Sequence, residues 1–534
     1  MKAIKFISAA LVAMAAAACT LNFEEINTNP NTIINGQIKA YNCLEPIIYG
    51  VARQEQYYSY FFNNEICQMT AATNSGTRQE HMYNITASNF QSVWDNYARF
   101  GYDCKHMIDL AYRDKDDFLK GVGYTLEALC LENLCSIFGD IPVEEAYKGS
   151  ENLTPAFNTQ EEAFNLIIEK LDSANVILAK SPTTTKGALD GIYGGSAAKW
   201  RKFANSLRMR LYLRMTGINS SYWNNIQEVL DNQEEYPIFT SSSDNATVAF
   251  KAEDPYMSYF GNGSRLDKGD FTMRRFTELV IKLMVEKDDQ NNTLFKDPRM
   301  VIYGVSGRDD KWIGTIAGCT EVEKKAVEKL ALAVPNYATS CNLDTPCWLM
   351  DFSELLFIEA EGVLKGKLTL SATAKELYEA AVTESVKKWI PFNELNSKPR
   401  AIKDKDITAF LAEPIASWDL AEEAETAPST SIYGSREELL ASQKWLSLYY
   451  VGFEQWNEWR RTEYPRVTIG NGTIYNQYEL PTRFQYPTYT ASTNPANVQS
   501  ALSRMGGSND MHTTLDWSYA KNNGGTHRDP YVEH

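Results

Sequence analysis

The stretch DFLKGVGYTLEALCLENLCSIFGDIP, residues 117 to 142, decides the fold class of this 534-residue chain. One stripe of it recurs at intervals of three and four residues, the period of one face of an α-helix. That stripe is Leu119, Val122, Leu126, Leu129, Cys130, Asn133 and Ile137. Gly139 and Pro142 stop the pattern, because glycine favours a helix end and proline cannot continue a helix. The stretch therefore predicts a helix over residues 117–138.

Similar helical periods lie on both sides of this stretch. Before it, Ser88 and Gln91 form a capping box ahead of a pattern that reaches Ala111, and after it Thr159 and Glu162 cap a pattern that ends near Leu178. Further helices are predicted over about 196–215, 351–364, 374–390 and 436–460. Helices in the first half start roughly 30 to 43 residues apart, which suits helix pairs stacked as in a tetratricopeptide-like array. We therefore expect an all-α-dominated fold with a helical scaffold over about 88–216 and 351–460.

The segment between these two parts of the scaffold, about 217–350, has a different composition. Only Phe271 to Lys287 has a clear helical pattern, and the rest is rich in Asn, Ser, Gly, Asp and aromatic residues. A long irregular stretch inside a helical scaffold is usually a functional elaboration. We expect a loop-rich, ligand-binding insertion here.

Composition narrows the class of protein. Hydrophobic residues make up 44% and charged residues 22%, as in ordinary folded proteins, and the net charge is −16. A general nucleic-acid binder is disfavoured, because the phosphate backbone requires a basic face. Aromatic residues reach 12%, which suits either thick helix packing or flat ligand platforms.

The N-terminus has the pattern of an export signal. Lys2 and Lys5 precede an uncharged stretch over 6–18, and this stretch ends in three alanines (16–18) directly before Cys19. We expect a signal peptide over 1–18, lipidation of Cys19, a polar tether over 19–35 and one folded domain over 36–534. The alternative is ordinary signal cleavage with Cys19 incidental. No later segment approaches the roughly 18 apolar residues of a membrane-spanning helix.

The other eight cysteines do not form a dense disulfide framework in a chain of this length. Cys104, Cys130 and Cys135 fall in helical apolar patterns, so we expect buried free thiols there. Cys341 and Cys347 flank a proline-containing loop and are the one pair to test for a disulfide. Five scattered histidines give no zinc motif, and we expect no metal and no cofactor.

A set of short motifs resembles the SusD/RagB family of outer-membrane nutrient-binding lipoproteins across nearly the whole mature chain. Each motif is weak alone, but their order is specific. In order they are FGDIPV (138–143), TPAF (154–157), LDSA (171–174), DGIYGG (190–195), KWRKFANSLRMR (199–210), DPR (297–299), EAE (359–361), QKW (443–445), RRT (460–462), YP (464–465) and YP (486–487).

The resemblance implies a SusD-like fold and a cell-surface lipoprotein that binds without cleaving. Such a protein captures a glycan and delivers it to a SusC-like TonB-dependent transporter in the outer membrane. The RagB branch leaves peptide capture open as an alternative. An α-helical glycoside hydrolase is a third, less favoured reading, because 68 acidic residues make some carboxylate pair inevitable.

Sugars bind by stacking their C–H faces on aromatic rings and by hydrogen bonds to polar side chains. Aromatic residues in polar loops are therefore the candidate ligand contacts, although each could instead pack under its own loop. They are Tyr83, Tyr256, Tyr259, Phe260 and Trp312. Tryptophans within helical patterns are expected in the core, namely Trp94, Trp200, Trp445 and Trp456. The basic residues between Lys199 and Arg214 are expected to pair with carboxylates, not to bind phosphate.

Overall fold

The computed structural model describes residues 38–73, 79–181, 187–260, 273–327, 331–397 and 399–524. Helix dominates this part of the chain, as predicted. The longer helices are α3 (Tyr41–Tyr58), α5 (Ala87–Asp114), α6 (Asp117–Phe138), α7 (Gln160–Leu178), α8 (Ala197–Met215), α9 (Tyr222–Asp231), α15 (Phe352–Leu364), α16 (Ala374–Asn393), α19 (Arg436–Ser447), α20 (Glu454–Thr462) and α22 (Pro495–Met505). Shorter helices are α4 (Asn64–Ile66), α11 (Glu278–Met284), α12 (Met300–Tyr303), α13 (Glu321–Val327), α14 (Tyr337–Ser340), α17 (Asp404–Phe410), α18 (Trp418–Ala424), α21 (Thr488–Thr493) and α23 (Tyr519–Asn522).

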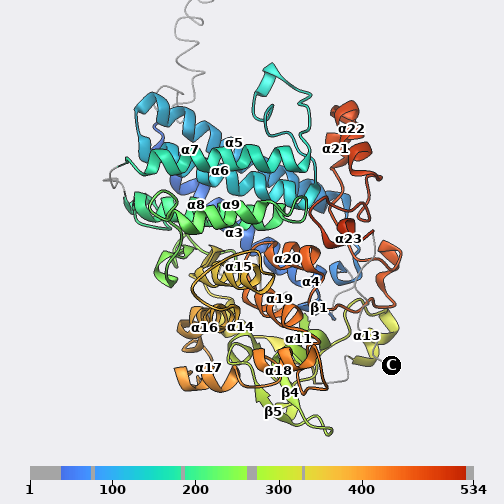
Figure 1. Cartoon of the computed structure of the whole chain (residues 1–534). Helices are drawn as coiled ribbons and strands as arrows, with labels where there is room; N and C mark the ends of the chain where they lie inside the picture. Colours follow the sequence, from blue (N-terminus) through green and yellow to red (C-terminus); the bar gives the residue numbers. More distant parts are fainter. Residues whose placement is uncertain are drawn as a thin grey trace, which may run out of the picture.

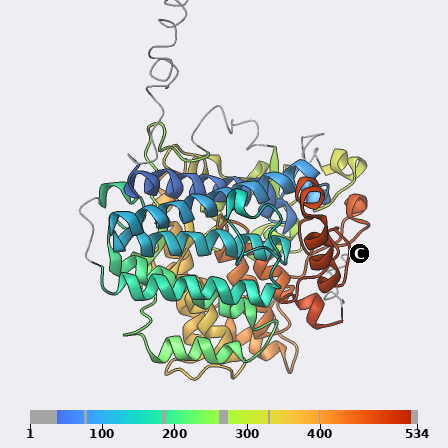
Figure 2. The same cartoon turned by 90° about the horizontal axis from the view of Figure 1, so that it is seen from above.

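The N-terminal helices pack one against the next, α3 on α5, then α5 through α9 in chain order, as Figures 1 and 2 show. Helix α6 has the predicted bounds, and Gly139 ends it with a φ of 95°, which glycine adopts readily. The predicted capping box of Thr159 and Glu162 is confirmed at α7. The capping box predicted at Ser88 and Gln91 is wrong by two residues. Thr86 caps α5 instead, because its side chain accepts the amide proton of Asn89.

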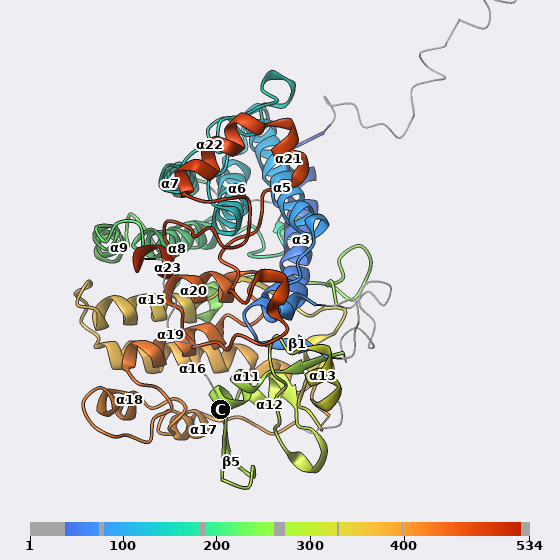
Figure 3. The same ribbon diagram turned by 90° about the vertical axis from the view of Figure 1, so that its right-hand side faces the viewer.

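A second stack is formed by α15, α16 and α19, and α8 joins the two stacks because it contacts both α6 and α15 (Figure 3). The single helix predicted over 436–460 is wrong: α19 and α20 are separate. Between them Gly452 has a φ of 46°, and a side chain there would collide with the buried carboxylate of Glu55. The break directs the start of α20 into the core.

Residues 217–350 contain more regular structure than we expected. Short antiparallel pairs join strand β1 (Thr70–Ala72) to β3 (Arg274–Phe276), β2 (Ala246–Val248) to β8 (Cys347–Met350), β4 (Val285–Lys287) to β5 (Thr293–Lys296), and β6 (Gly304–Val305) to β7 (Val334–Pro335). The helix predicted over 271–287 is wrong at both ends. Thr277 caps α11, which lies between β3 and β4, because residues 274–276 pair with β1 in register Thr70↔Phe276. Helix α9 was not predicted.

Helix α3 was also not predicted. Pro46 lies inside it, and it continues as a π-helix over Ser59–Asn63. Proline lowers the helical signal of a sequence, and the run of Tyr and Phe that follows does not have a simple period. This helix is the one that carries the candidate site described below.

The buried core is continuous between the two stacks. Trp200, Trp445 and Trp456 are fully buried, as predicted, whereas Trp94 is half-buried and stacks on Phe157. Cys104, Cys130 and Cys135 are buried free thiols, and Cys341 and Cys347 are also free. Cys19 and the whole segment before residue 38 lie outside the described residues, among which no helix is long and apolar enough to cross a membrane.

Candidate functional site

Three of the five predicted ligand residues, Tyr256, Tyr259 and Phe260, lie on one segment that is clamped against α3. The Arg53 side chain donates from Nε to the Met257 carbonyl at 2.8 Å. The amide of Tyr259 donates to Gln56 Oε1 at 2.9 Å. Hydrogen bonds therefore hold the backbone of this segment to two consecutive turns of α3.

The same segment is also fixed from its other side. The Ser258 amide donates to the Leu343 carbonyl at 2.7 Å, and its hydroxyl donates to the Asn342 carbonyl at 2.6 Å. Gln56 links both sides, since its Nε2 donates to the Thr345 carbonyl at 2.7 Å. The segment is thus preorganised between α3 and residues 342–345.

Two half-buried tyrosine rings result from this clamp. Tyr256 packs at 5.1 Å from the ring of Tyr49, and Lys251 Nζ lies 4.3 Å from the Tyr256 ring centre. Tyr259 packs at 5.2 Å from the ring of Tyr57. Each ring keeps part of its surface in solvent, so the segment presents aromatic surface beside polar groups.

The phenol groups here remain neutral donors at neutral pH. A hydrogen bond to Glu45, at 2.9 Å from the Tyr256 hydroxyl, raises the pKa of Tyr256. Burial, and then the charge of Glu45, raises the pKa of Tyr49, whose hydroxyl donates to the Ala249 carbonyl at 3.2 Å. An uncharged ring with a polar tip suits a neutral polyhydroxylated ligand.

The other predicted residues are placed differently. Phe260 is buried between the rings of Tyr60 and Tyr450, at 5.7 and 5.4 Å. Trp312 is 4% exposed and lies at 5.7 Å from Lys296 Nζ. The structure does not bring Trp312 into the Tyr256 segment, and the role of both rings as ligand contacts stays a prediction.

Tyr83 is fully buried, with a left-handed φ of 61°. Its hydroxyl accepts a hydrogen bond from Gln68 Nε2 at 3.0 Å, and the same amide donates to the Thr468 carbonyl. Tyr83 therefore supports the backbone of a loop that begins near residue 468, and its role as a ligand contact stays a prediction.

Sequence reasoning missed the α3 side of the site, namely Tyr49, Arg53, Gln56 and Tyr57. The signal was present in the run over 49–62, which contains six aromatic residues and the polar stretch Arg53 to Gln56. Without α3 as a predicted helix, the spacing of Tyr49, Arg53 and Gln56 on one helical face could not be recognised.

Two clefts lie elsewhere, on either side of the β4–β5 hairpin. One has a volume of about 760 Å³ and is lined by α11, β4 and residues 414–415, and the other has about 380 Å³ beside β5 and residues 400–409. None of the five predicted residues lines either cleft. The lining of the larger cleft mixes aliphatic and charged side chains and contains no aromatic ring, so this cleft is poorly suited to sugar stacking.

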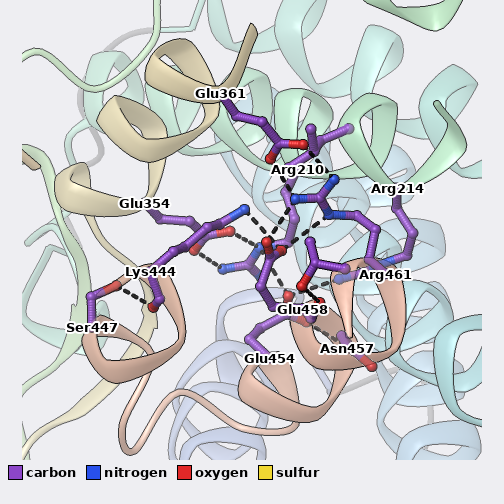
Figure 4. Close-up of polar contacts among 12 residues, drawn as sticks. Arg210, Arg214, Glu354, Glu361, Lys444, Ser447, Glu454, Asn457, Glu458 and Arg461 are labelled. Atoms are coloured by element: carbon purple, nitrogen blue, oxygen red, sulfur yellow. Dashed lines mark hydrogen bonds and ion pairs between the residues drawn. The ribbon is translucent and has the colours of Figure 1, made fainter. Parts of the chain in front are cut away.

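The basic side of α8 forms a buried network of ion pairs where α6, α8, α15, α19 and α20 meet (Figure 4). Arg210 makes two hydrogen bonds of 2.6 Å to Glu354. Arg214 contacts Glu132 at 2.5 Å and Glu454 at 2.7 Å. The predicted pairing of these arginines with carboxylates is confirmed.

Two further cations complete this network. Arg461 contacts both Glu361 and Glu458, and Lys444 Nζ lies 2.9 Å from Glu458. Cavities of only about 10 Å³ lie among these groups. That is room for about one water molecule, so no sugar ring can reach the carboxylates.

Burial and pairing act in opposite directions on these carboxyls. Burial raises the pKa of Glu132 to about 7 despite Arg214. For Glu454 burial would raise the pKa, but Arg214 and Arg210 hold it below its usual value. The network therefore links the helices through buried ion pairs, in which Arg210 and Arg214 neutralise the surrounding carboxylates. Among the described residues, no group of three or more His, Cys, Asp or Glu side chains is placed to hold a metal ion.

The fold is a stacked helical scaffold in which a clamped loop presents two partly exposed aromatic rings. A family model described as "Starch-binding associating with outer membrane", SusD-like_2, matches residues 30–487. The chain belongs to this SusD-like family. The resemblance stated from the motifs is thereby confirmed.

Solved structures show the same fold at low identity. A chitin-binding protein aligns with a TM-score of 0.71 and 19% identity, over 90% of this chain and 100% of its own. A SusD homologue from Bacteroides fragilis aligns with a TM-score of 0.71 and 19% identity, over 90% of this chain and 99% of its own. A chitin-binding SusD homologue from Flavobacterium johnsoniae aligns with a TM-score of 0.68 and 20% identity, over 90% of this chain and 99% of its own. A comparison with curated proteins finds no match.

Proposed function

We propose that this protein binds a neutral glycan at the surface of the outer membrane and does not cleave it. The observation that carries the proposal is the pair of half-buried rings, Tyr256 and Tyr259, on a segment fixed to α3 by hydrogen bonds. Membership of a family described as starch-binding and associating with the outer membrane supports it. Solved structures of the same fold include chitin-binding proteins.

The clamp favours binding energetically. A loop already held in one conformation loses little entropy when a ligand docks, so more of the stacking energy appears as affinity. The Tyr256 hydroxyl and the Lys251 ammonium lie beside the ring and can hydrogen-bond sugar hydroxyls. Binding without cleavage is consistent with the enclosed carboxylates of the charge network, which are out of reach of a sugar.

We further propose that Cys19 carries a lipid anchor and that the protein delivers its glycan to a SusC-like TonB-dependent transporter. The support for the anchor is the signal pattern over 1–18, and the support for delivery is the family resemblance. Native protein should co-purify with a large β-barrel in mild detergent. Purification without a barrel, from cells grown on the inducing nutrient, would argue against delivery.

The binding proposal is tested with soluble oligosaccharides by calorimetry. The variant Tyr256→Ala/Tyr259→Ala should weaken binding of maltoheptaose or chitohexaose, whichever the wild type binds, by about 1–3 kcal/mol per ring, by analogy with base stacking on aromatic rings. Tyr489→Ala is the matched control, because its ring is 64% exposed and lies on α21. Oligosaccharide incubated with the protein should keep its length. Hydrolysis abolished by one carboxylate substitution would overturn the binding-only role.

A further inference from the structure

A second set of exposed aromatic residues lies on a loop that the site above does not use. Ile474, Tyr475 and Tyr478 are 53%, 49% and 53% exposed, and they follow one another on the short helix η7 (Thr473–Asn476) and its end. The exposed Asn471, Gln477 and Glu479 stand between and beside them. We define this surface, residues 471–479, as the outer platform.

The backbone of the outer platform is rigidly tied. Its buried residues Thr473 and Asn476 make the internal bonds: the Thr473 hydroxyl donates to the Gly470 carbonyl at 2.7 Å, and Asn476 Nδ2 donates to the Glu479 carbonyl at 2.8 Å. The Tyr478 amide donates to the Thr473 carbonyl at 3.1 Å. The backbone that carries the exposed rings is therefore held by the buried half of the loop.

The loop also fits closely against residues 317–323, which include the first turn of α13 (Figure 1). The Gly472 amide donates to the Gly318 carbonyl at 2.7 Å, and Asn471 Nδ2 donates to Glu323 Oε1 at 2.8 Å. A side chain at Gly470 or Gly472 would collide with the backbone of residues 317–319. On its other side η7 packs against η2 (Glu80–Met82), directly before Tyr83.

The conformation of the loop is costly for its sequence. Gln477 and Tyr478 have φ angles of 58° and 62°, in the left-handed region that bulky side chains rarely adopt. Glycine or asparagine would suit these positions better for folding. This strain is at Gln477 and Tyr478, and the Tyr478 ring that it positions is 53% exposed, which points to a use outside the fold.

The chemistry of the outer platform indicates what it contacts. Its sequence from Ile469 to Leu480 contains no Lys or Arg and one carboxylate, Glu479, which accepts a hydrogen bond or ion pair from His512. An anionic polymer would be repelled, since the whole chain also carries a net charge of −16. Tyrosine rings interleaved with amides suit a neutral polyhydroxylated ligand.

We propose that the outer platform is a second contact site for a neutral glycan chain, separate from the Tyr256–Tyr259 segment. This inference rests on the proposed glycan-binding function and adds a second site to it. A polymer held at two sites of one protein dissociates more slowly than a short oligomer held at one, because the second contact is intramolecular. The platform thus selects long chains over short ones.

Retention in native gels that contain soluble starch or glycol chitin tests this. The variant Tyr475→Ala/Tyr478→Ala should lower the apparent affinity for the polymer about 10-fold or more, and leave calorimetric binding of the matching short oligosaccharide unchanged. Tyr102→Ala/Tyr489→Ala is the control, since those rings are 50% and 64% exposed elsewhere. Tyr475→Ala/Tyr478→Asn removes both rings with a residue that tolerates the left-handed backbone, and guards against misfolding. Alginate, an anionic polymer, should not be retained.

The outcomes separate the two sites. Unchanged polymer retention in both platform variants, with loss in Tyr256→Ala/Tyr259→Ala, overturns the outer platform alone. If the platform variants lose polymer retention while Tyr256→Ala/Tyr259→Ala keeps it, the outer platform is supported and the Tyr256–Tyr259 site is overturned. No retention of the wild type by any neutral polymer overturns both. Loss of a co-purifying barrel, with glycan retention intact, assigns the platform to a protein partner and also overturns the proposal.

Discussion

The buried network around Arg210 and the segment around Tyr256 differ in where their side chains face: the charged groups of the network face one another, and the rings of the segment face solvent in part. The network includes Arg210, Lys444 and Arg461 from the family-like motifs, yet its groups face one another and enclose only about 10 Å³ of space. The Tyr256 segment carries no such motif, yet its rings are partly in solvent on a clamped backbone. These motif residues therefore act within the scaffold, whereas the proposed ligand contacts lie on a loop outside the motifs.

The largest effect is expected from breaking one pair in the network. Arg210→Met should destabilise the fold by about 3–5 kcal/mol, because it leaves Glu354 buried without its partner. Chemical denaturation of the purified protein measures this. The double variant Arg210→Met/Glu354→Leu should recover most of the loss, since an apolar pair of similar size can replace a buried ion pair.

An exposed ion pair provides the matched control for that experiment. Lys105→Met, which removes a solvent-exposed pair with Asp109, should change stability by less than about 0.5 kcal/mol. Equal losses for Arg210→Met and Lys105→Met would contradict the structural role assigned to the network.

A cavity in the scaffold should have a comparable effect. Trp200 is fully buried and donates from Nε1 to Asp190 Oδ2 at 2.7 Å. Trp200→Ala should cost about 3–5 kcal/mol of unfolding free energy, measured by denaturation. Oligosaccharide affinity of the folded fraction should stay unchanged, and a selective loss of affinity would give Trp200 a place in the site.

The stability of the scaffold should depend on pH through Glu55. Burial raises the pKa of Glu55 to about 8 in the folded state, although Tyr97 donates a hydrogen bond to it at 2.8 Å. The folded state holds this proton more tightly than the unfolded chain. The contribution of Glu55 to the free energy of unfolding is therefore full below about pH 4.5 and is lost as pH rises towards 8. Glu55→Gln should flatten the fall in stability over this range. Part of the slope should remain, from Glu65, Glu132, Glu359 and Asp140, whose pKa values are also raised.

Among the buried network, the scaffold and the loop, the smallest stability effect is expected at the loop. Tyr256→Ala should lower the free energy of unfolding by no more than about 1 kcal/mol, because the ring is only half-buried. A loss as large as that of Trp200→Ala would show that the ring belongs to the core, and would remove the contrast between the two regions.

The helices were predictable where local period and caps agree. Helix α6 and the Thr159 cap of α7 follow from residues three and four apart, which do not depend on distant parts of the chain. The separation of α19 from α20 was not predictable, because it depends on Glu55, nearly 400 residues earlier, lying against Gly452. Tertiary contacts decide such breaks.

The candidate site was predictable only in part for the same reason. The polar, aromatic composition of residues 254–260 indicated a ligand loop, but Tyr83 and Phe260 have the same kind of sequence neighbourhood and are enclosed in the fold. Whether an aromatic ring in a loop is covered depends on segments distant in sequence, here Gln68 over Tyr83 and Tyr450 over Phe260. Sequence can propose such rings but cannot rank them.

A crystal structure of the protein with a bound neutral oligosaccharide tests the central claim most directly. The account predicts intact sugar rings stacked on Tyr256 and Tyr259, about 4 Å from the aromatic carbons, with no change at the buried network. An oligosaccharide in the cleft between α11 and the β4–β5 hairpin, or a shortened product beside a carboxylate pair, would contradict it.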